Sequence, residues 1–379
     1  MKVNSTLLIL LLMIMFPQIV ETIYSPALGS IVDAFSVSTV QAAQTLSVYF
    51  SSFAIGVAVW GIIADKWGRR PSMLAGLLIY GLATCTAMLT GSFTILMFAR
   101  AMSAFGIAVG SVITQTMLRD LYTGVELGKV FSLVSMGIAL SPIIGMLVGG
   151  QLTQMGGYQY VFAALSVSAF LLFVLNRAKL PETRPERIKS VNLVLLAKRL
   201  YSDSHIWHSA LLVALYNVAL FSYYQLGSFT FHQLGRSVEE FGNSGFILSV
   251  GTLMGSYLNK RLLERDISQH KLLWLANGFL LFGALGVYLL NTTIWFLIPM
   301  LQVVMAFGIA MPNVISSALQ QYQDNLGSAG ALFGLLYYLI IGSGLMLAGI
   351  VQDLGLVLPG VAILISLVML SQSRNYFHT

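Results

Sequence analysis

The sequence predicts an all-α membrane protein whose twelve transmembrane helices divide six plus six. Of its 379 residues, 57% are hydrophobic and only 9% are charged, whereas a soluble domain carries about 25% charged residues. Apolar stretches of about 20 residues, the length that crosses a bilayer as a helix, recur along the chain. The basic residues gather in every second connection between these stretches, as expected when those connections face the cytoplasm.

The first half of the chain contains six apolar stretches, at residues 5–28, 40–63, 72–92, 94–118, 128–152 and 158–176. The run from Leu7 to Ile14 is similar to the core of a secretory signal. No small-residue cleavage site follows it, and the hydrophobicity continues to Ile23. We therefore expect the first stretch to be a retained span, and residues 1–176 to form an N-terminal six-helix bundle.

The longest polar break separates the two halves. Residues 177–205 contain Pro181, Glu182, Pro185, Glu186 and seven basic residues, which predict a cytoplasmic linker. Six more apolar stretches follow, at residues 206–232, 244–263, 271–290, 293–318, 327–350 and 355–371. They predict a C-terminal six-helix bundle over residues 206–379.

The basic residues predict the orientation of these spans. With the N-terminus inside, only Arg236 faces outward and Arg100 lies within a span, while eighteen others fall on the cytoplasmic side. The eighteen are Lys2, Lys66, Arg69, Arg70, Arg119, Lys129, Arg177, Lys179, Arg184, Arg187, Lys189, Lys198, Arg199, Lys260, Arg261, Arg265, Lys271 and Arg374. Both termini are therefore expected in the cytoplasm, and the net charge of +6 indicates membrane topology rather than binding of nucleic acid.

Enzyme and metal chemistry find no support in the sequence. Cys85 is the only cysteine, so an intramolecular disulfide and a cysteine metal cluster are excluded. No phosphate-binding glycine loop, zinc-binding helix or catalytic triad pattern is present. We expect no enzymatic activity, no cofactor, no metal ion and no direct use of ATP.

The connection between the second and third spans reads Gly61-Ile-Ile-Ala-Asp65-Lys66-Trp-Gly68-Arg69-Arg70-Pro71. It resembles the signature loop of the major facilitator superfamily, although a basic turn that only fixes topology is the alternative. In that family the loop bridges helices 2 and 11 and holds the outward-facing state. The resemblance implies a conformational latch, and we expect Asp65, Arg69 and Asp120 to form a charge network near residues 328–330. The latch residues are Gly61, Asp65, Gly68, Arg69, Arg70 and Asp120.

The fifth span carries small residues at every fourth position: Gly137, Ser141, Gly145 and Gly149. They share one helical face, which lets a neighbouring helix approach closely, and Pro142 bends the helix between them. The pattern resembles the antiporter motif of the superfamily, which is associated with exporters. Ordinary glycine packing is the alternative.

The first and fourth spans each contain a charged residue. The stretch from Arg100 to Gly106, with Arg119 and Asp120 at the span's end, is similar to the helix-4 motif of drug:proton antiporters. The stretch from Glu21 to Leu28 resembles helix 1 of the bicyclomycin-resistance (Bcr/CflA) efflux subgroup, whose acid occupies the position of Thr22 here. Glu21 lies roughly 24 Å from the cytoplasm and Arg100 roughly 10 Å from the outside, so their depths nearly coincide in a layer of about 30 Å.

Because a charged side chain within a span needs a partner of opposite charge or a wet cavity, the similar depths predict that Glu21 and Arg100 are partners. Glu21 would then be the proton-binding carboxylate. The alternatives are that Glu21 only anchors the first helix and that Arg100 extends to the outer interface. A central substrate cavity is expected from the polar and aromatic residues of the spans. The candidates are Gln18, Tyr24, Gln115, Tyr216, Asn217, Tyr224, Gln225, Asn313 and Tyr337, with Tyr223, Gln302 and Tyr338 as further groups.

The resemblance implies the major facilitator fold and a proton-coupled antiporter of the bacterial inner membrane. It would export small amphipathic or cationic compounds or drugs by alternating access. The alternatives are export of a natural metabolite, such as a siderophore or an amino acid, and a sensor that keeps the fold without transporting. The implied partners are the small-molecule substrate, protons and the lipid bilayer, and the chain is expected to be a monomer.

Overall fold

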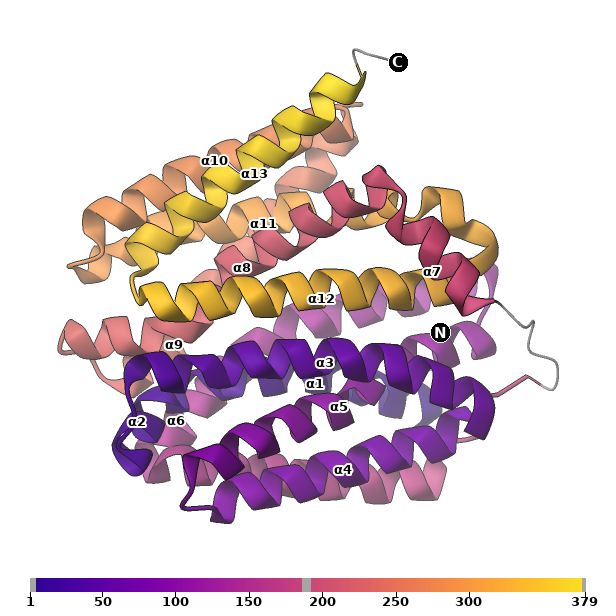
Figure 1. The fold of residues 1–379 in the computed structure, drawn as a ribbon, viewed down its shortest axis with the longest axis horizontal. Helices are drawn as coiled ribbons and strands as arrows, with labels where there is room; N and C mark the ends of the chain where they lie inside the picture. Colours follow the sequence, from indigo (N-terminus) through magenta and orange to yellow (C-terminus); the bar gives the residue numbers. More distant parts are fainter. Residues whose placement is uncertain (1–4, 186–191, 377–379) are drawn as a thin grey trace.

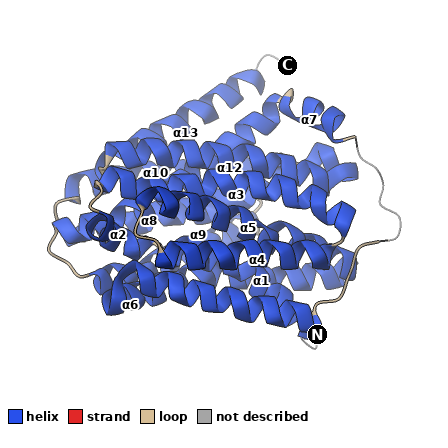
Figure 2. Ribbon diagram, turned by 60° about the horizontal axis from the view of Figure 1, so that its bottom comes forward, coloured by secondary structure: helices blue, strands red, loops and turns tan. Residues whose placement is uncertain are grey.

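The structure, a computed structural model, describes residues 5–185 and 192–376 as helices joined by short connections (Figure 1). The described part contains no strand (Figure 2). Lys2, Glu186, Arg187 and Lys189, four residues used in the topology prediction, lie outside the described residues. The side chain of Arg374 does as well.

Six spans of the N-terminal half lie on seven segments. They are α1 (Ser5–Ile23), η1 (Ser25–Ala27), α2 (Leu28–Phe35), α3 (Thr39–Trp67), α4 (Arg69–Leu89), α5 (Phe93–Leu121) and α6 (Gly124–Lys179). A capping box starts α3, because the Ser38 side chain accepts from the Gln41 amide while the Gln41 side chain accepts from the Ser38 amide. Gly68, with a φ of 109°, lets α4 begin directly after α3 ends.

Helix α6 is two helices joined by a turn at Gly156 and Gly157, whose backbone angles are not helical. The first part of α6 runs alongside α1. A Cβ atom added at Gly137 would contact Met15, and one added at Gly149 would contact Ile23. The second part runs back, since Asn176 near its end lies against the sulfur of Met13. The α6 segment therefore supplies the fifth and sixth spans.

The C-terminal half comprises α7 (Leu193–Tyr201), α8 (Ser204–Gln233), α9 (Val238–Leu263), α10 (Gln269–Leu290), η2 (Ile294–Phe296), α11 (Leu297–Ala318), η3 (Gln320–Asn325), α12 (Leu326–Val351) and α13 (Leu354–Tyr376). The short helix α7 lies in the stretch predicted to be a linker. The Asn192 side chain caps it by accepting from the Leu195 amide, and Leu196 and Leu200 are buried. Those two leucines, four residues apart, are the signal from which it could have been predicted.

Ten helices of the described chain are long and apolar enough to cross a membrane. One of these ten is α6, which consists of two helices and therefore supplies two spans. Helix α9 is not among the ten but has the length of a span, so the total is twelve. Helix α9 falls short because glycines, serines and Asn243 interrupt its apolar sequence and charges occupy both ends. Large side chains such as Leu89, Phe98 and Phe282 are 77%, 66% and 73% exposed, which suits a surface covered by lipid rather than water.

The twelve helices form two six-helix bundles, α1–α6 and α8–α13, which lie side by side (Figure 1). Helix α3 packs along α12, and α6 packs along α9, so these four helices bring the bundles together. We call the end that carries residue 5, the 65–70 connection and residues 180–203 the linker end. The opposite end, which carries residues 36–38, 90–92, 234–237 and 352–353, is the far end.

Candidate functional site

Side-chain hydrogen bonds join the two bundles toward the far end. The Gln225 Nε2 atom of α8 donates to the Ala43 carbonyl at 2.9 Å and to the Ser47 hydroxyl at 3.2 Å, both on α3. Gln44 of α3 donates to the Met346 carbonyl of α12 at 3.1 Å. The hydroxyl of Ser25 donates to the carbonyl of Tyr224. We call this set of contacts the far-end seal.

Two glycines complete the far-end seal where α6 meets α9. A Cβ atom added at Gly150 would lie 3.0 Å from the Cα of Gly242, and one added at Gly242 would lie 2.8 Å from the Met146 carbonyl oxygen. These distances leave no room for a side chain at either position. The two backbones are therefore in direct contact, which closes this end of the interface.

A layer of aromatic rings lies beside the seal, between the bundles. The ring of Phe50 lies 4.5 Å from that of Phe221, and the ring of Phe53 lies 5.0 Å from that of Tyr338, measured between centroids. Phe50 and Phe53 belong to α3, whereas Phe221 and Tyr338 belong to α8 and α12. The layer thus extends the closed part of the interface toward the centre.

Two cavities open between the bundles on the linker-end side of this layer. The first, of about 520 Å³, lies between α1 and α6 on one side and α8, α9 and α11 on the other. The second, of about 410 Å³, lies between α3 and α5 on one side and α11 and α12 on the other. Ile315 of α11 lines both. Volumes of this order hold a drug-sized molecule.

Five of the candidate cavity residues line these cavities. Gln18, Asn217 and Tyr224 line the first cavity, and Gln115 and Tyr337 line the second, together with Tyr338. The other four candidates, Tyr24, Tyr216, Gln225 and Asn313, do not line either cavity. Sequence alone could not separate the two groups, because each depends on how the bundles are placed.

The four remaining candidates are buried in packing or in the seal. Gln225 belongs to the far-end seal, and the Tyr24 hydroxyl donates to Thr45 at 2.8 Å. The side chain of Asn313 donates to Asn259 of α9 at 2.7 Å, and Tyr216 is only 1% exposed. None of these four lines either of the two cavities.

Glu21 and Arg100 are both buried in the N-terminal bundle, with 2% and 1% of their surfaces exposed. Among the described residues, no ion pair joins them, contrary to the predicted direct contact. The Arg100 guanidinium instead lies over the rings of Tyr24 and Tyr49, at 3.8 and 4.5 Å from their centroids. These faces attract a cation, especially where water is excluded. Burial also excludes the alternative that Arg100 extends to the interface.

The Glu21 carboxylate lies within electrostatic range of Arg100 and of the hydroxyls of Tyr49, Tyr224 and Tyr338. Within the described residues, its Oε1 atom and all three guanidinium nitrogens of Arg100 lack a hydrogen-bond partner. Unsatisfied buried groups are costly. The site therefore holds a carboxyl group and a guanidinium cation that interact electrostatically without a direct ion pair.

Tyr49 and Tyr80 are the site residues that sequence reasoning missed. Both are fully buried, their hydroxyls have no hydrogen-bond partner in the described part of the chain, and both interact electrostatically with Arg100. Their signal in the sequence was weak, because tyrosines within spans are common and the charge they face lies on another helix. Only the fold places α3 and α4 against Arg100.

Thr22 and Glu21, adjacent in sequence, face different surroundings. Thr22 lines the first cavity and its hydroxyl donates to the Gln18 carbonyl at 3.0 Å. A Cβ atom added at Gly145 would meet the Thr22 side chain and would lie 2.9 Å from the Ile19 carbonyl oxygen. The small-residue face of α6, including Gly137 and Gly149, thus packs directly on α1.

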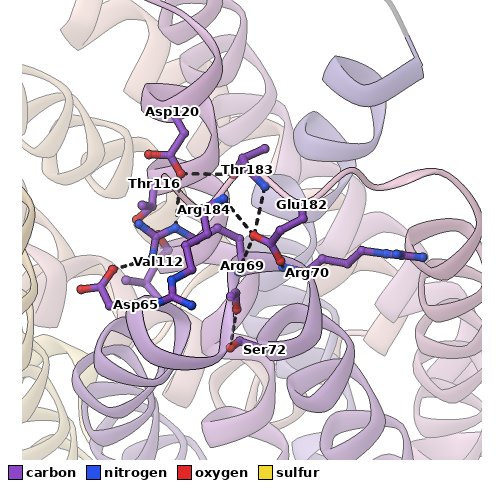
Figure 3. A network of polar contacts seen from close by, with 11 residues as sticks. Asp65, Arg69, Arg70, Ser72, Val112, Thr116, Asp120, Glu182, Thr183 and Arg184 are labelled. Atoms are coloured by element: carbon purple, nitrogen blue, oxygen red, sulfur yellow. Dashed lines mark hydrogen bonds and ion pairs between the residues drawn. The ribbon is translucent and has the colours of Figure 1, made fainter. Parts of the chain in front are cut away.

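Asp65, Arg69 and Asp120 lie together at the linker end (Figure 3). The Arg69 guanidinium contacts the Asp65 carboxylate at 2.5 Å and the Asp120 carboxylate at 3.2 Å. The Arg69 side chain is only 6% exposed, whereas that of Asp65 is 48% exposed. The partners of this network come from α3, α4, α5 and residues 182–184. Among the described residues, no hydrogen bond or ion pair joins the network to residues 328–330, near which it was expected.

Glu182, which follows α6, was not predicted to belong to this network. Its carboxylate accepts hydrogen bonds from the backbone amides of Arg69 at 2.9 Å, Arg70 at 3.1 Å, Thr183 at 3.0 Å and Arg184 at 2.9 Å (Figure 3). Thr183 adds a bond from its hydroxyl to Asp120 at 3.1 Å. The start of the linker is thereby fastened to the 65–70 connection.

Replacing Glu182 with alanine is expected to release this fastening. Partial burial would raise the pKa of Glu182, but the four backbone hydrogen bonds outweigh it and hold the pKa below its usual value of 4.5. The carboxylate therefore stabilises the contact above pH 4.5, and the stabilisation is lost as the pH falls through the lowered pKa. Amide hydrogen exchange at Arg69 and Arg70 should accelerate in the variant at neutral pH.

The exposed Glu239, in the first turn of α9, provides the control. Glu239→Ala should leave exchange at Arg69 and Arg70 unchanged. Equal protection of the two amides in wild type and Glu182→Ala would contradict the fastening.

The sequence and the fold of this chain are similar to those of known proteins. The sequence profile described as "Major Facilitator Superfamily" matches residues 10–348. "Multidrug resistance protein D" of Escherichia coli (strain K12) is 30% identical over 354 residues, 90% of this chain and 87% of the relative. An "Uncharacterized transporter" of Rickettsia bellii (strain RML369-C) is 29% identical over 350 residues, 88% and 87% of the two chains. The solved D-xylose-proton symporter has a TM-score of 0.75 at 17% identity over 96% of both chains, a likeness of fold alone.

Proposed function

The chain belongs to the major facilitator superfamily, and from this premise we propose that it is a proton-driven antiporter that exports small amphipathic compounds from the cytoplasm. Membership confirms the family predicted from residues 61–71. It also makes the chain a multi-pass membrane transporter and not an enzyme. Coupling to protons, direction and substrate are the proposed parts.

The orientation proposed is the one in which the linker end faces the cytoplasm. It is supported by the basic residues, most of which lie in connections at that end. In this orientation the two cavities open toward the cytoplasm and the far-end seal closes the outer side. A compound would enter from the cytoplasm and leave after the bundles rock to open the seal.

The observation that carries the proposal is the buried carboxyl group of Glu21, whose Oε1 atom has no hydrogen-bond partner among the residues that the structure describes. Burying an ionisable acid inside a membrane protein is costly, so a retained one points to a functional role. Glu21 lies within electrostatic range of Tyr224 of the first cavity and Tyr337 of the second. A compound arriving in either cavity would alter the surroundings of the acid, and the acid would exchange its proton in response.

Glu21→Gln tests this role, since glutamine keeps the shape of the side chain and cannot ionise. We expect substrate to release protons from the wild-type protein in detergent and to release none from the variant. In reconstituted vesicles, the variant should lose transport driven by a pH gradient while still exchanging substrate for substrate.

The control is Asp33→Asn, which removes an acid that is exposed near the end of α2. This variant should release protons as the wild type does. Undiminished proton release in Glu21→Gln would remove Glu21 from the mechanism and direct attention to Asp120.

A further inference from the structure

The walls of the two cavities carry almost no charge. Among the described residues, no Asp, Glu, Lys, Arg or His lines the first cavity, and Arg119 is the only such residue that lines the second. Glu21 and Arg100 line neither. A charged compound in the first cavity would therefore lose its hydration without meeting a countercharge, and that loss is large.

The first cavity is nevertheless polar in a particular way. Three of its hydroxyl groups donate within their own helices: Ser135 to Phe131, Ser249 to Gly245 and Thr252 to Leu248, at 2.9, 3.0 and 3.0 Å from the carbonyl oxygens. Thr22 donates to Gln18 in the same way. The oxygen lone pairs of these four hydroxyls remain to accept hydrogen bonds from a guest.

Asn217 of α8 adds to this acceptor surface. Its amide nitrogen donates to the Val213 carbonyl at 2.7 Å, and within the described residues no donor reaches its Oδ1 atom. Apolar and aromatic groups, among them Phe221, Phe307 and Met311, make up much of the remaining wall. Donors are fewer: they are the Tyr224 hydroxyl and the amide nitrogens of Gln18 and Asn259. The cavity thus combines an apolar surface with an excess of hydrogen-bond acceptors, and no charged side chain of the described residues lines it.

From this combination we infer that the first cavity selects uncharged amphipathic compounds that carry hydrogen-bond donors, such as hydroxyl or amide N–H groups, and discriminates against lipophilic cations. The inference rests on the proposed function and makes its substrate class narrower. Aromatic faces such as that of Phe221 attract a cation, but less strongly than loss of hydration opposes its entry.

Export of an uncharged compound in exchange for a proton moves net charge across the membrane. Glu21 and Arg100 already balance each other when the acid is ionised, so an uncharged guest needs no further compensation. When the carboxylate takes a proton from outside and releases it inside as the guest leaves outward, one positive charge moves inward per cycle. Export of this class is therefore driven by the membrane potential as well as by the pH gradient.

Binding to the purified, detergent-solubilised chain tests the class directly. Chloramphenicol is an uncharged aromatic compound with hydroxyl and amide N–H donors, and its diacetyl ester lacks the hydroxyl donors while being more apolar. Tetraphenylphosphonium is a lipophilic cation of comparable size. We expect chloramphenicol to bind about tenfold more tightly than either of the others, since the loss of two hydroxyl donors, or of hydration without a countercharge, costs roughly this factor.

The variant Asn217→Asp provides the sharpest contrast, because it puts a carboxylate of nearly the same shape into the first cavity. At mildly alkaline pH, its affinity for tetraphenylphosphonium should rise about tenfold, the effect of a countercharge in a poorly hydrated site. Asn192→Asp is the matched control: Asn192 is exposed and caps α7, a role that aspartate also fills. This control should bind all three compounds as the wild type does.

The outcomes separate this inference from the proposed function. Tighter binding of tetraphenylphosphonium, of an anionic analogue or of the diacetyl ester to the wild type would overturn the substrate class and leave antiport standing. Unchanged cation affinity in Asn217→Asp would overturn the assignment to the first cavity. Chloramphenicol binding without proton-linked or potential-linked movement in vesicles would support the class and overturn antiport.

Discussion

Replacing Gly242 with leucine is expected to hold the far end open and to stop transport. The leucine would have to occupy space filled by Gly150 and by the Met146 carbonyl oxygen, 2.9 and 2.8 Å from the added Cβ atom. Overpacking of this kind costs about 1–3 kcal/mol, and a cost of that size shifts a two-state ratio about 5- to 150-fold. The state with the seal closed should therefore become rare.

A single cysteine at Ser135, which lines the first cavity, can report this shift. Because Cys85 is the only native cysteine, Cys85→Ser supplies the background. Labelling by a membrane-impermeant maleimide in inside-out vesicles should fall sharply in Gly242→Leu. Gly278→Leu is the control, since no atom of the described residues lies within 4 Å of a Cβ atom added there. Labelling at the wild-type rate in Gly242→Leu would show that the glycine contact does not govern the seal.

Gly145→Leu is expected to abolish transport while the protein remains inserted and folded. The added side chain would meet the backbone of α1 at the Ile19 carbonyl and the Ile23 amide, 2.9 and 3.0 Å from the Cβ atom. Backbone cannot move aside as a flexible side chain can, so α1 and α6 would separate. Their separation would displace Thr22 and Glu21, which α1 carries.

The measurement is substrate transport in vesicles together with size-exclusion chromatography of the solubilised variant. Gly128→Leu, on the same helix, is the control because its added Cβ atom has nothing within 4 Å. Gly145→Ala should give an intermediate loss and keeps the prediction testable if the leucine variant aggregates. Full transport by a monodisperse Gly145→Leu protein would make the close approach of α1 and α6 incidental.

The sequence predicts the helical architecture well because each span must satisfy its backbone internally in lipid. All twelve predicted spans correspond to helices, including α9, which is less apolar than the others and whose place the sorting of the basic residues supports. The turn at Gly156 and Gly157 was likewise expected as a break between two spans. The division into domains at residues 176 and 206 remains a prediction.

The side-chain partners were harder to predict because they depend on rotation about each helix and on the relative position of the bundles. Depth alone suggested that Glu21 and Arg100 meet, but depth says nothing of direction around the helix. Tyr24 and Tyr49 cover Arg100 instead. Glu182 was not predicted for a different reason. Its partners are backbone amides, which every residue except proline has, so the sequence does not reveal them.

The two kinds of contact in the far-end seal differ in how much freedom they restrict. Glycine has no side chain to order when Gly150 and Gly242 come together, whereas Gln225 and Gln44 must each give up rotamer freedom worth up to about 2 kcal/mol. The glutamine contacts therefore weaken faster on warming than the glycine contact. On heating, the far end should therefore first become permeable to water along α3, α8 and α12, while α6 and α9 still touch.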